Sequence, residues 1–184
     1  MALEPELKEA ILNLSAKERD KLLLRLITKD KKLTKQLQHQ LLDGPESLDR
    51  KREEVSNAIT ERSNQIRNYQ PPRVFLSNVR EWSTLVNEYA SITKDKYGEM
   101  ELRLFLLEKI QEFGGGYLGN LTEKNEKLAR YVASRVKQIL PIYDKLHEDF
   151  QFDFRDRLNT VLSFFSSSAA SLFIKQLGLP TELD

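Results

Sequence analysis

The residues best suited to chemistry in this chain are two pairs of carboxylates. Glu123 and Glu126 are three residues apart, as are Asp153 and Asp156, so each pair shares one face of a helix. Carboxylate oxygens are the ligands that Mg²⁺ prefers, and two pairs on facing helices can hold a divalent ion between them. The sequence therefore allows a site for Mg or Mn made by these four residues.

This layout resembles the Glu-x-x-Glu and Glu-x-x-Asp pairs of all-α nucleotide pyrophosphohydrolases. The resemblance covers only the two short pairs, and it implies a metal-dependent nucleotide hydrolase. The chain departs from the pattern because its second pair is Asp/Asp and no further glutamate flanks the first pair. We identify no family. We favour a simpler role, in which both pairs lie at helix N-termini and interact with the helix dipole without a ligand.

Other catalytic chemistry has little support in this sequence. There is no cysteine, and the two histidines, His39 and His147, are far apart and outside any metal-binding spacing. No Gly-x-Ser-x-Gly turn is present. The glycine run 114–116 lacks the Gly-Lys-Ser/Thr ending of a phosphate loop, so we interpret it as a helix terminator. These observations favour a protein without a catalytic site or cofactor.

A basic stretch near the N-terminus is the feature that could bind nucleic acid. Residues 17–40 contain eight Lys or Arg against three acids. The side chains that would contact phosphates are Lys17, Lys21, Arg25, Lys32 and Lys35. Because no aromatic residue is interleaved for base stacking, and no helix-turn-helix pattern is evident, a solvated face is the favoured interpretation.

Composition places the chain among globular proteins. Its 184 residues are 40% hydrophobic and 31% charged, with a net charge of +1. The longest apolar stretch, 161–174, is shorter than the roughly 20 residues that a membrane helix needs. The acidic N-terminus does not look like a signal peptide. We therefore expect a cytoplasmic protein that does not enter a membrane.

Apolar residues recur three and four positions apart through most of the chain, which is the spacing of amphipathic helices. This pattern predicts an all-α fold of seven to eight helices, arranged as an irregular antiparallel bundle or as stacked helical hairpins. The helices are expected at about 5–14, 15–28, 30–43, 47–68, 73–93, 99–113, 122–150 with a kink at Pro141, and 153–177.

The chain is expected to have three parts. Residues 1–44 form an N-terminal unit of short helical hairpins, either peripheral or part of one domain. Residues 45–72 form a charged helix followed by a Pro-Pro break, because a proline disfavours helical geometry in the residue before it. Residues 73–184 supply the main helical core, with the almost wholly apolar helix 99–113 at its centre.

The helix at 47–68 carries only a thin apolar stripe, made of Leu48, Val55, Ile59 and Ile66. Such a stripe is typical of a coiled-coil-like contact or of a helix at the edge of a domain. The favoured function is therefore a non-enzymatic interaction or scaffold domain that contacts another protein or associates with itself. The alternatives are the metal-dependent nucleotide hydrolase and the nucleic-acid-binding protein.

Overall fold

The computed structural model describes residues 3–44, 46–66 and 70–183. In these residues it contains nine α-helices and no strand, so the expected all-α fold is confirmed. The sequence predicted seven or eight helices, and the additional one arises where the last expected helix is divided in two. None of the described helices has both the length and the apolar character that crossing a membrane requires.

The chain divides into two compact units, residues 1–44 and 45–184. We call these the N-terminal unit and the core unit and describe each by itself. Part of the expected charged helix and Pro-Pro break, residues 67–69, lies outside the described residues, as does residue 45.

The N-terminal unit consists of three short helices: α1 (Pro5–Leu12), α2 (Ala16–Lys29) and α3 (Lys31–Leu42). The expected capping box at the start of α2 is confirmed, because the Ser15 hydroxyl accepts from the Glu18 amide while the Glu18 carboxylate accepts from the Ser15 amide. The carboxylate of Asp30 caps α3 by accepting from the amides of Lys32 and Leu33. α2 packs on α3.

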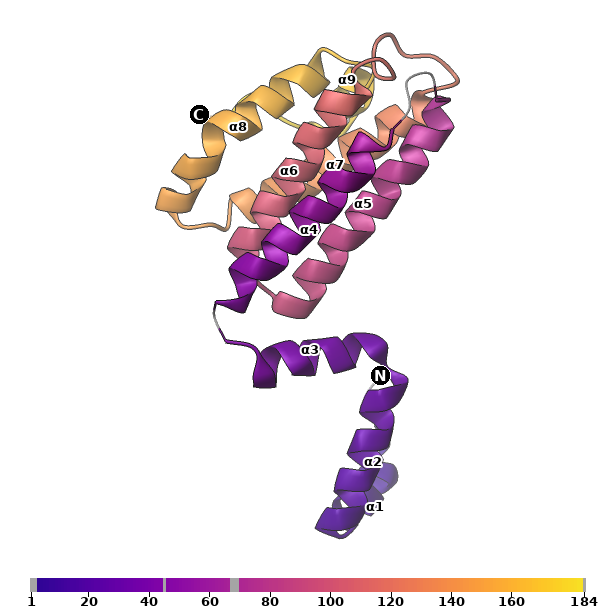
Figure 1. The fold of residues 1–184 in the computed structure, drawn as a ribbon, viewed down its shortest axis with the longest axis vertical. Coiled ribbons are helices and arrows are strands. Elements are labelled where there is room, and N and C mark those ends of the chain that lie inside the picture. The colour runs from indigo at the N-terminus through magenta and orange to yellow at the C-terminus, as the bar shows by residue number, and fades with distance from the viewer. Residues whose placement is uncertain (1–2, 45, 67–69, 184) are drawn as a thin grey trace. The chain divides into compact units, whose positions relative to one another are not determined.

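The core unit consists of α4 (Ser47–Asn64), α5 (Pro72–Thr93), α6 (Lys96–Gly114), α7 (Glu126–Tyr143), α8 (Glu148–Ser166) and α9 (Ser171–Gln176). As Figure 1 shows, α4, α5 and α6 lie side by side, and α6 also packs on α7 and α8. Lys94 adopts a left-handed φ of 57°, which ends α5 and turns the chain into α6.

One hydrophobic core joins the helices of this unit. α6 lies at its centre, as its nearly continuous apolar sequence predicted, and ten of its residues are buried. The only tryptophan, Trp82, is fully buried on α5, where its ring meets that of Phe75 edge to face at 6.1 Å. The core therefore has a single, aromatic-rich centre.

The expected helix 122–150 is wrong at both ends. α7 begins at Glu126 and passes through Pro141, but it ends at Tyr143, and α8 begins five residues later. A proline removes one backbone donor and weakens the helix around it. The side-chain amide of Gln151 donates to the carbonyls of Tyr143 and Leu146, at 3.1 Å each, and this closes the turn. In the sequence, the apolar residues keep their helical spacing across this turn. The spacing alone therefore could not reveal that one helix ends and another begins here.

The expected helix 153–177 is also divided, because α8 ends at Ser166 and α9 begins at Ser171. Serine hydroxyls can bond to nearby carbonyls and compete with the helix. Here the Ser168 hydroxyl bonds to the carbonyl of Phe165 at 2.9 Å. The amide of Ala169 then leaves the helix and donates to the carbonyl of Leu118, also at 2.9 Å.

Candidate functional site

The predicted carboxylate ligands do not assemble into a metal site. No group of three or more His, Cys, Asp or Glu able to hold a metal ion occurs among the described residues. Glu123 and Glu126 line a shallow pocket of about 390 Å³. Glu126 pairs with Arg130 at 2.9 Å, and that guanidinium lies over the ring of Phe173 at 4.5 Å. This carboxylate is therefore already engaged by a cation.

The second carboxylate pair is exposed on α8. We expected Asp153 and Asp156 at the start of a helix, but α8 begins at Glu148, so both lie beyond its first turn. The capping role that we favoured for this pair is therefore wrong. The pKa of Tyr97 is raised mainly by burial, with added repulsion from neighbouring carboxylates that include Asp153. Neither member of this pair belongs to a possible metal-binding group among the described residues, and we do not propose a metal-dependent hydrolase.

The thin apolar stripe of α4 packs within the core unit. Ile59 is fully buried, Val55 and Ile66 pack against the core, and Leu48 is partly buried. Of the two interpretations that the sequence allowed, a helix at the edge of a domain fits these positions. We therefore do not propose this stripe as a contact surface.

The core unit contains a buried ion pair that the sequence analysis missed. On α6, Glu99 and Arg103 are each 7% exposed, and the guanidinium donates to the carboxylate at 2.8 and 3.0 Å. Arg103 also donates to the side-chain carbonyl of Asn87, and Lys96 donates to Glu99. Opposite charges four residues apart, between apolar neighbours at 100, 102 and 104, were the available signal. Because every charge has a partner, the network fits a structural role.

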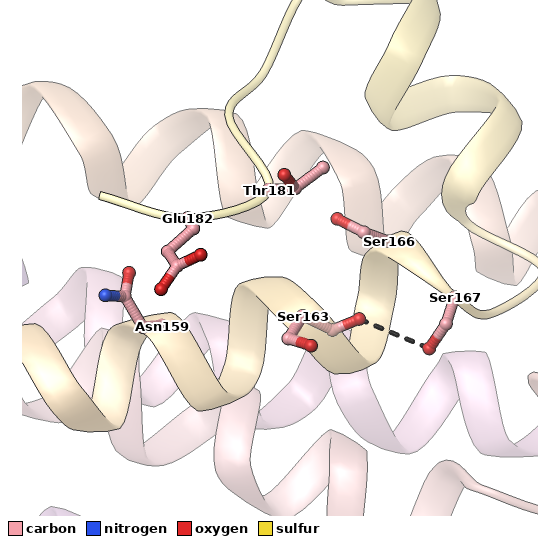
Figure 2. A pocket seen from close by; sticks show the side chains of 6 residues that line it. All are labelled: Asn159, Ser163, Ser166, Ser167, Thr181 and Glu182. Carbon is pink, nitrogen blue, oxygen red and sulfur yellow. Dashed lines mark hydrogen bonds between the residues drawn. The ribbon is translucent and has the colours of Figure 1, made fainter. Parts of the chain in front are cut away.

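A hydroxyl-lined pocket of about 470 Å³ lies between α8 and the C-terminal segment (Figure 2). Its lining consists of Asn159, Ser163, Ser166, Ser167, Thr181 and Glu182. The amide of Asn159 holds the segment in place through two bonds to the backbone of Leu183, at 2.8 and 3.0 Å. Glu182 is the one ionisable side chain of this lining. The pocket therefore presents hydrogen-bonding side chains.

The N-terminal unit differs from every other part of the described chain in its exposed leucines. None of its residues from 3 to 44 is buried. Eight leucines are each at least half exposed: Leu3, Leu7, Leu12, Leu23, Leu24, Leu26, Leu41 and Leu42. A groove of about 400 Å³ lies between α1 and α2, with an apolar lining that includes Ile11, Leu22, Leu23 and Leu26. We call this the leucine groove.

The predicted nucleic-acid contacts belong to the same unit. Lys17, Lys21 and Arg25 are exposed along one face of α2, and Lys32 and Lys35 are exposed on α3. The basic face of α2 therefore lies beside its leucines on the same helix. Nucleic-acid binding by these residues stays a prediction.

Comparisons of the chain with protein-family models, with curated proteins and with solved structures found no match. The functional argument therefore depends on the geometry described above.

Proposed function

We propose that this chain is a non-enzymatic interaction protein. In this proposal the N-terminal unit binds a partner protein, and the core unit is the stably folded domain to which it is attached. The observation that carries this proposal is the exposure of the leucines in residues 3–44, where no side chain is buried. Large exposed apolar surfaces in folded proteins commonly mark sites of protein association.

The length of the helices supports the same conclusion. α1, α2 and α3 have 8, 14 and 12 residues, at or below the roughly 12–15 residues at which isolated helices are marginal in water. Helices in proteins are stabilised mainly by packing of an apolar face. A unit of this size usually needs additional stabilisation such as oligomerisation. A partner that covers the leucines would supply that packing.

The shape and charge of the surface favour an amphipathic helix with acidic flanks as the bound element. The leucine groove presents apolar side chains that can accept anchors at helical spacing. Beside it, α2 exposes Lys17, Lys21 and Arg25, which would attract carboxylates on the partner. Arg19 and Asp20 also line the groove and can fix the register of the bound helix.

The test is capture from native lysate by the tagged full chain, with Leu23 and Leu26 both replaced by Glu in one variant. Leu172→Glu is the matched control, since this leucine is 46% exposed on α9 of the core unit. We expect a protein that is retained by the wild type and by the control, and lost with the double variant. Binding of that purified protein should weaken as salt rises.

Other results would contradict the proposal in defined ways. Equal retention by the double variant would show that the leucine groove is not the binding site. Loss of the captured protein after nuclease treatment would instead support nucleic-acid binding by the lysines of α2 and α3. A dimer of the purified wild type in light scattering, abolished by the double variant, would identify a second copy as the occupant.

A further inference from the structure

Two arginines of the core unit lie over the ring of one tyrosine, Tyr131 on α7. The guanidinium carbon of Arg135, one turn further along α7, is 4.7 Å from the ring centroid, and that of Arg80 on α5 is 5.6 Å from it. Both are cation–π distances. The sum of the two distances, about 10 Å, is the largest separation that the two guanidinium carbons can have. We call Arg80 and Arg135 the arginine pair.

The ring that holds the arginine pair is itself fixed to α5. The Tyr131 hydroxyl donates to Oγ of Ser83 at 2.9 Å, and the Ser83 hydroxyl donates in turn to the carbonyl of Val79, also at 2.9 Å. Ser83 is buried. An arginine side chain loses rotamer freedom when it binds a ligand, and contact with a fixed ring beforehand reduces that cost. The two guanidiniums are thus partly ordered before a ligand arrives.

Neither arginine of the pair forms an ion pair with a carboxylate of the described residues, whereas Arg130 on the same helix pairs with Glu126. Arg135 donates to the Ser134 hydroxyl, but at 3.4 Å these bonds are long. Arg80 is exposed and Arg135 is partly exposed, so a ligand in solution can reach both side chains. Each guanidinium has five N–H donors and no acceptor, so its natural partner is an anion.

The surroundings of the arginine pair are positively charged. α7 contains four Lys or Arg and a single acid, and that acid, Glu126, is already paired with Arg130. Lys127 lies one turn before Tyr131 on the same face of α7, is exposed, and forms no ion pair with the described residues. A surface with several cations and few counter-charges attracts anions.

We propose that the arginine pair binds a diphosphate-bearing ligand, with one guanidinium bonded to each phosphoryl group. The planar guanidinium matches phosphate oxygens bidentately, and such charge-assisted bonds are strong. A diphosphate provides two adjacent groups, so two guanidiniums up to about 10 Å apart can each bind one of them. Lys127 adds a third positive charge beside them. A diphosphate also carries more negative charge than a dicarboxylate of similar length, which suits three cations.

The test is titration calorimetry of the full chain with pyrophosphate at low salt, with orthophosphate as the second probe. We expect one saturable pyrophosphate site that weakens as salt rises. Orthophosphate should bind about tenfold more weakly, because it offers only one phosphoryl group to the two arginines and loses at least one charge-assisted hydrogen bond.

A set of variants locates the site. Arg80→Gln and Arg135→Gln should each weaken pyrophosphate binding about tenfold. Arg135→Lys should also weaken it, because lysine keeps the charge but not the planar fork. Arg130→Gln is the matched control: it removes the same charge from the same helix, but from an arginine that already has a carboxylate partner. This control should leave binding nearly unchanged. A thermal melt of each variant confirms that it is folded.

Three results would overturn the proposal. The first is the absence of a saturable pyrophosphate site. The second is an equal loss in Arg130→Gln and Arg135→Gln, which would show a response to net charge alone, or a loss in Arg25→Gln on α2, which would place the site in the N-terminal unit. The third is orthophosphate binding as tight as that of pyrophosphate, which would exclude a site built for two phosphoryl groups.

Discussion

The helices of residues 3–44 and those of the core unit carry apolar stripes of the same helical period, yet only the core unit buries them. In the core unit, six helices pack together with α6 at their centre, and residues such as Leu104 are fully buried. In the N-terminal unit, three short helices leave all residues from 3 to 44 at least partly exposed. A helical stripe thus indicates a face that needs a partner, and whether the same chain supplies that partner depends on how many helices can enclose it.

The strongest test of this contrast is a pair of identical substitutions, Leu104→Ala in the core and Leu26→Ala in α2. Leu104 is fully buried, so its truncation should destabilise the core unit by about 2–5 kcal/mol. Leu26 is 52% exposed, so its truncation should change stability by less than about 0.5 kcal/mol. Urea unfolding followed by Trp82 fluorescence measures both, because this tryptophan reports on the core. Similar losses for the two variants would contradict the contrast.

A smaller effect is expected where the backbone itself is closely packed. At Gly98 on α6, an added Cβ would collide with the carboxylate of Asp95, the hydroxyl of Tyr89 and the side chain of Arg52. The first two are joined by a hydrogen bond of 2.7 Å, so neither can move without breaking it. Gly98→Ala should therefore destabilise the core unit by about 1–3 kcal/mol in urea unfolding.

The matched control for this glycine is Gly116→Ala, which lies in the turn after α6. Apart from the glycine itself and its two chain neighbours, no described atom lies within 4 Å of the Cβ that this substitution would add. It should be neutral or slightly stabilising, because alanine restricts the unfolded chain. A neutral Gly98→Ala would show that the corner of Asp95, Tyr89 and Arg52 is more loosely packed than the structure indicates.

The buried network of α6 makes the stability of the core unit depend on pH. Burial alone would raise the pKa of Glu99, but hydrogen bonds and charge from Lys96 and Arg103 outweigh it and hold the pKa below its ordinary value of 4.5. A lowered carboxylate pKa stabilises the folded state above the unfolded pKa, and this contribution is lost as pH falls through the folded pKa. Urea midpoints measured from neutral pH downward should therefore fall more steeply in the wild type than in Glu99→Gln.

Glu112→Gln provides the comparison for that measurement. Glu112 also pairs with a lysine on α6, Lys109 at 2.8 Å, but its side chain is 57% exposed. Exposed ion pairs contribute little to stability, so this variant should keep the acid response of the wild type. If Glu99→Gln responds to acid as the wild type does, the buried pair does not control the pH dependence.

Local signals allowed the elements of the fold to be predicted, and long-range contacts explain most of the errors. The Ser15–Glu18 capping box and the apolar face around Trp82 can be read within a few residues of sequence. The end of α7 could not, because the bonds from Gln151 that close its turn reach back as far as eight residues. Periodicity also cannot tell a continuous helix from two helices whose stripes happen to align, which is why the helix was expected to reach Phe150.

The candidate sites were harder to predict than the helices. The acids were grouped by their spacing along the chain, but a metal site needs residues from different helices to meet, and these do not. The buried network of Glu99 and Arg103 on α6 also includes Asn87 on α5, and this contact becomes evident only after folding. The leucines of α2, by contrast, are prominent in the sequence, and only their exposure required the structure.

The smallest predicted effect belongs to the N-terminal unit and concerns the cap of α2. Hydrogen bonds from the Ser15 hydroxyl and then from its backbone amide lower the pKa of Glu18 below 4.5. The cap therefore stabilises α2 at pH values above 4.5, the ordinary pKa of a glutamate. This stabilisation is lost as pH falls through the lowered pKa of Glu18. Carbon chemical shifts of residues 16–19 should lose helical character on acidification in the wild type. In Ser15→Ala they should start lower and respond less, because the hydroxyl no longer anchors the carboxylate. The urea midpoint of the core unit should stay the same in this variant, since Ser15 bonds only within its own turn. A urea midpoint that falls together with the helical character of α2 would show that the N-terminal unit and the core unit are energetically coupled. That result would contradict the separate stabilities that we expect for the two units.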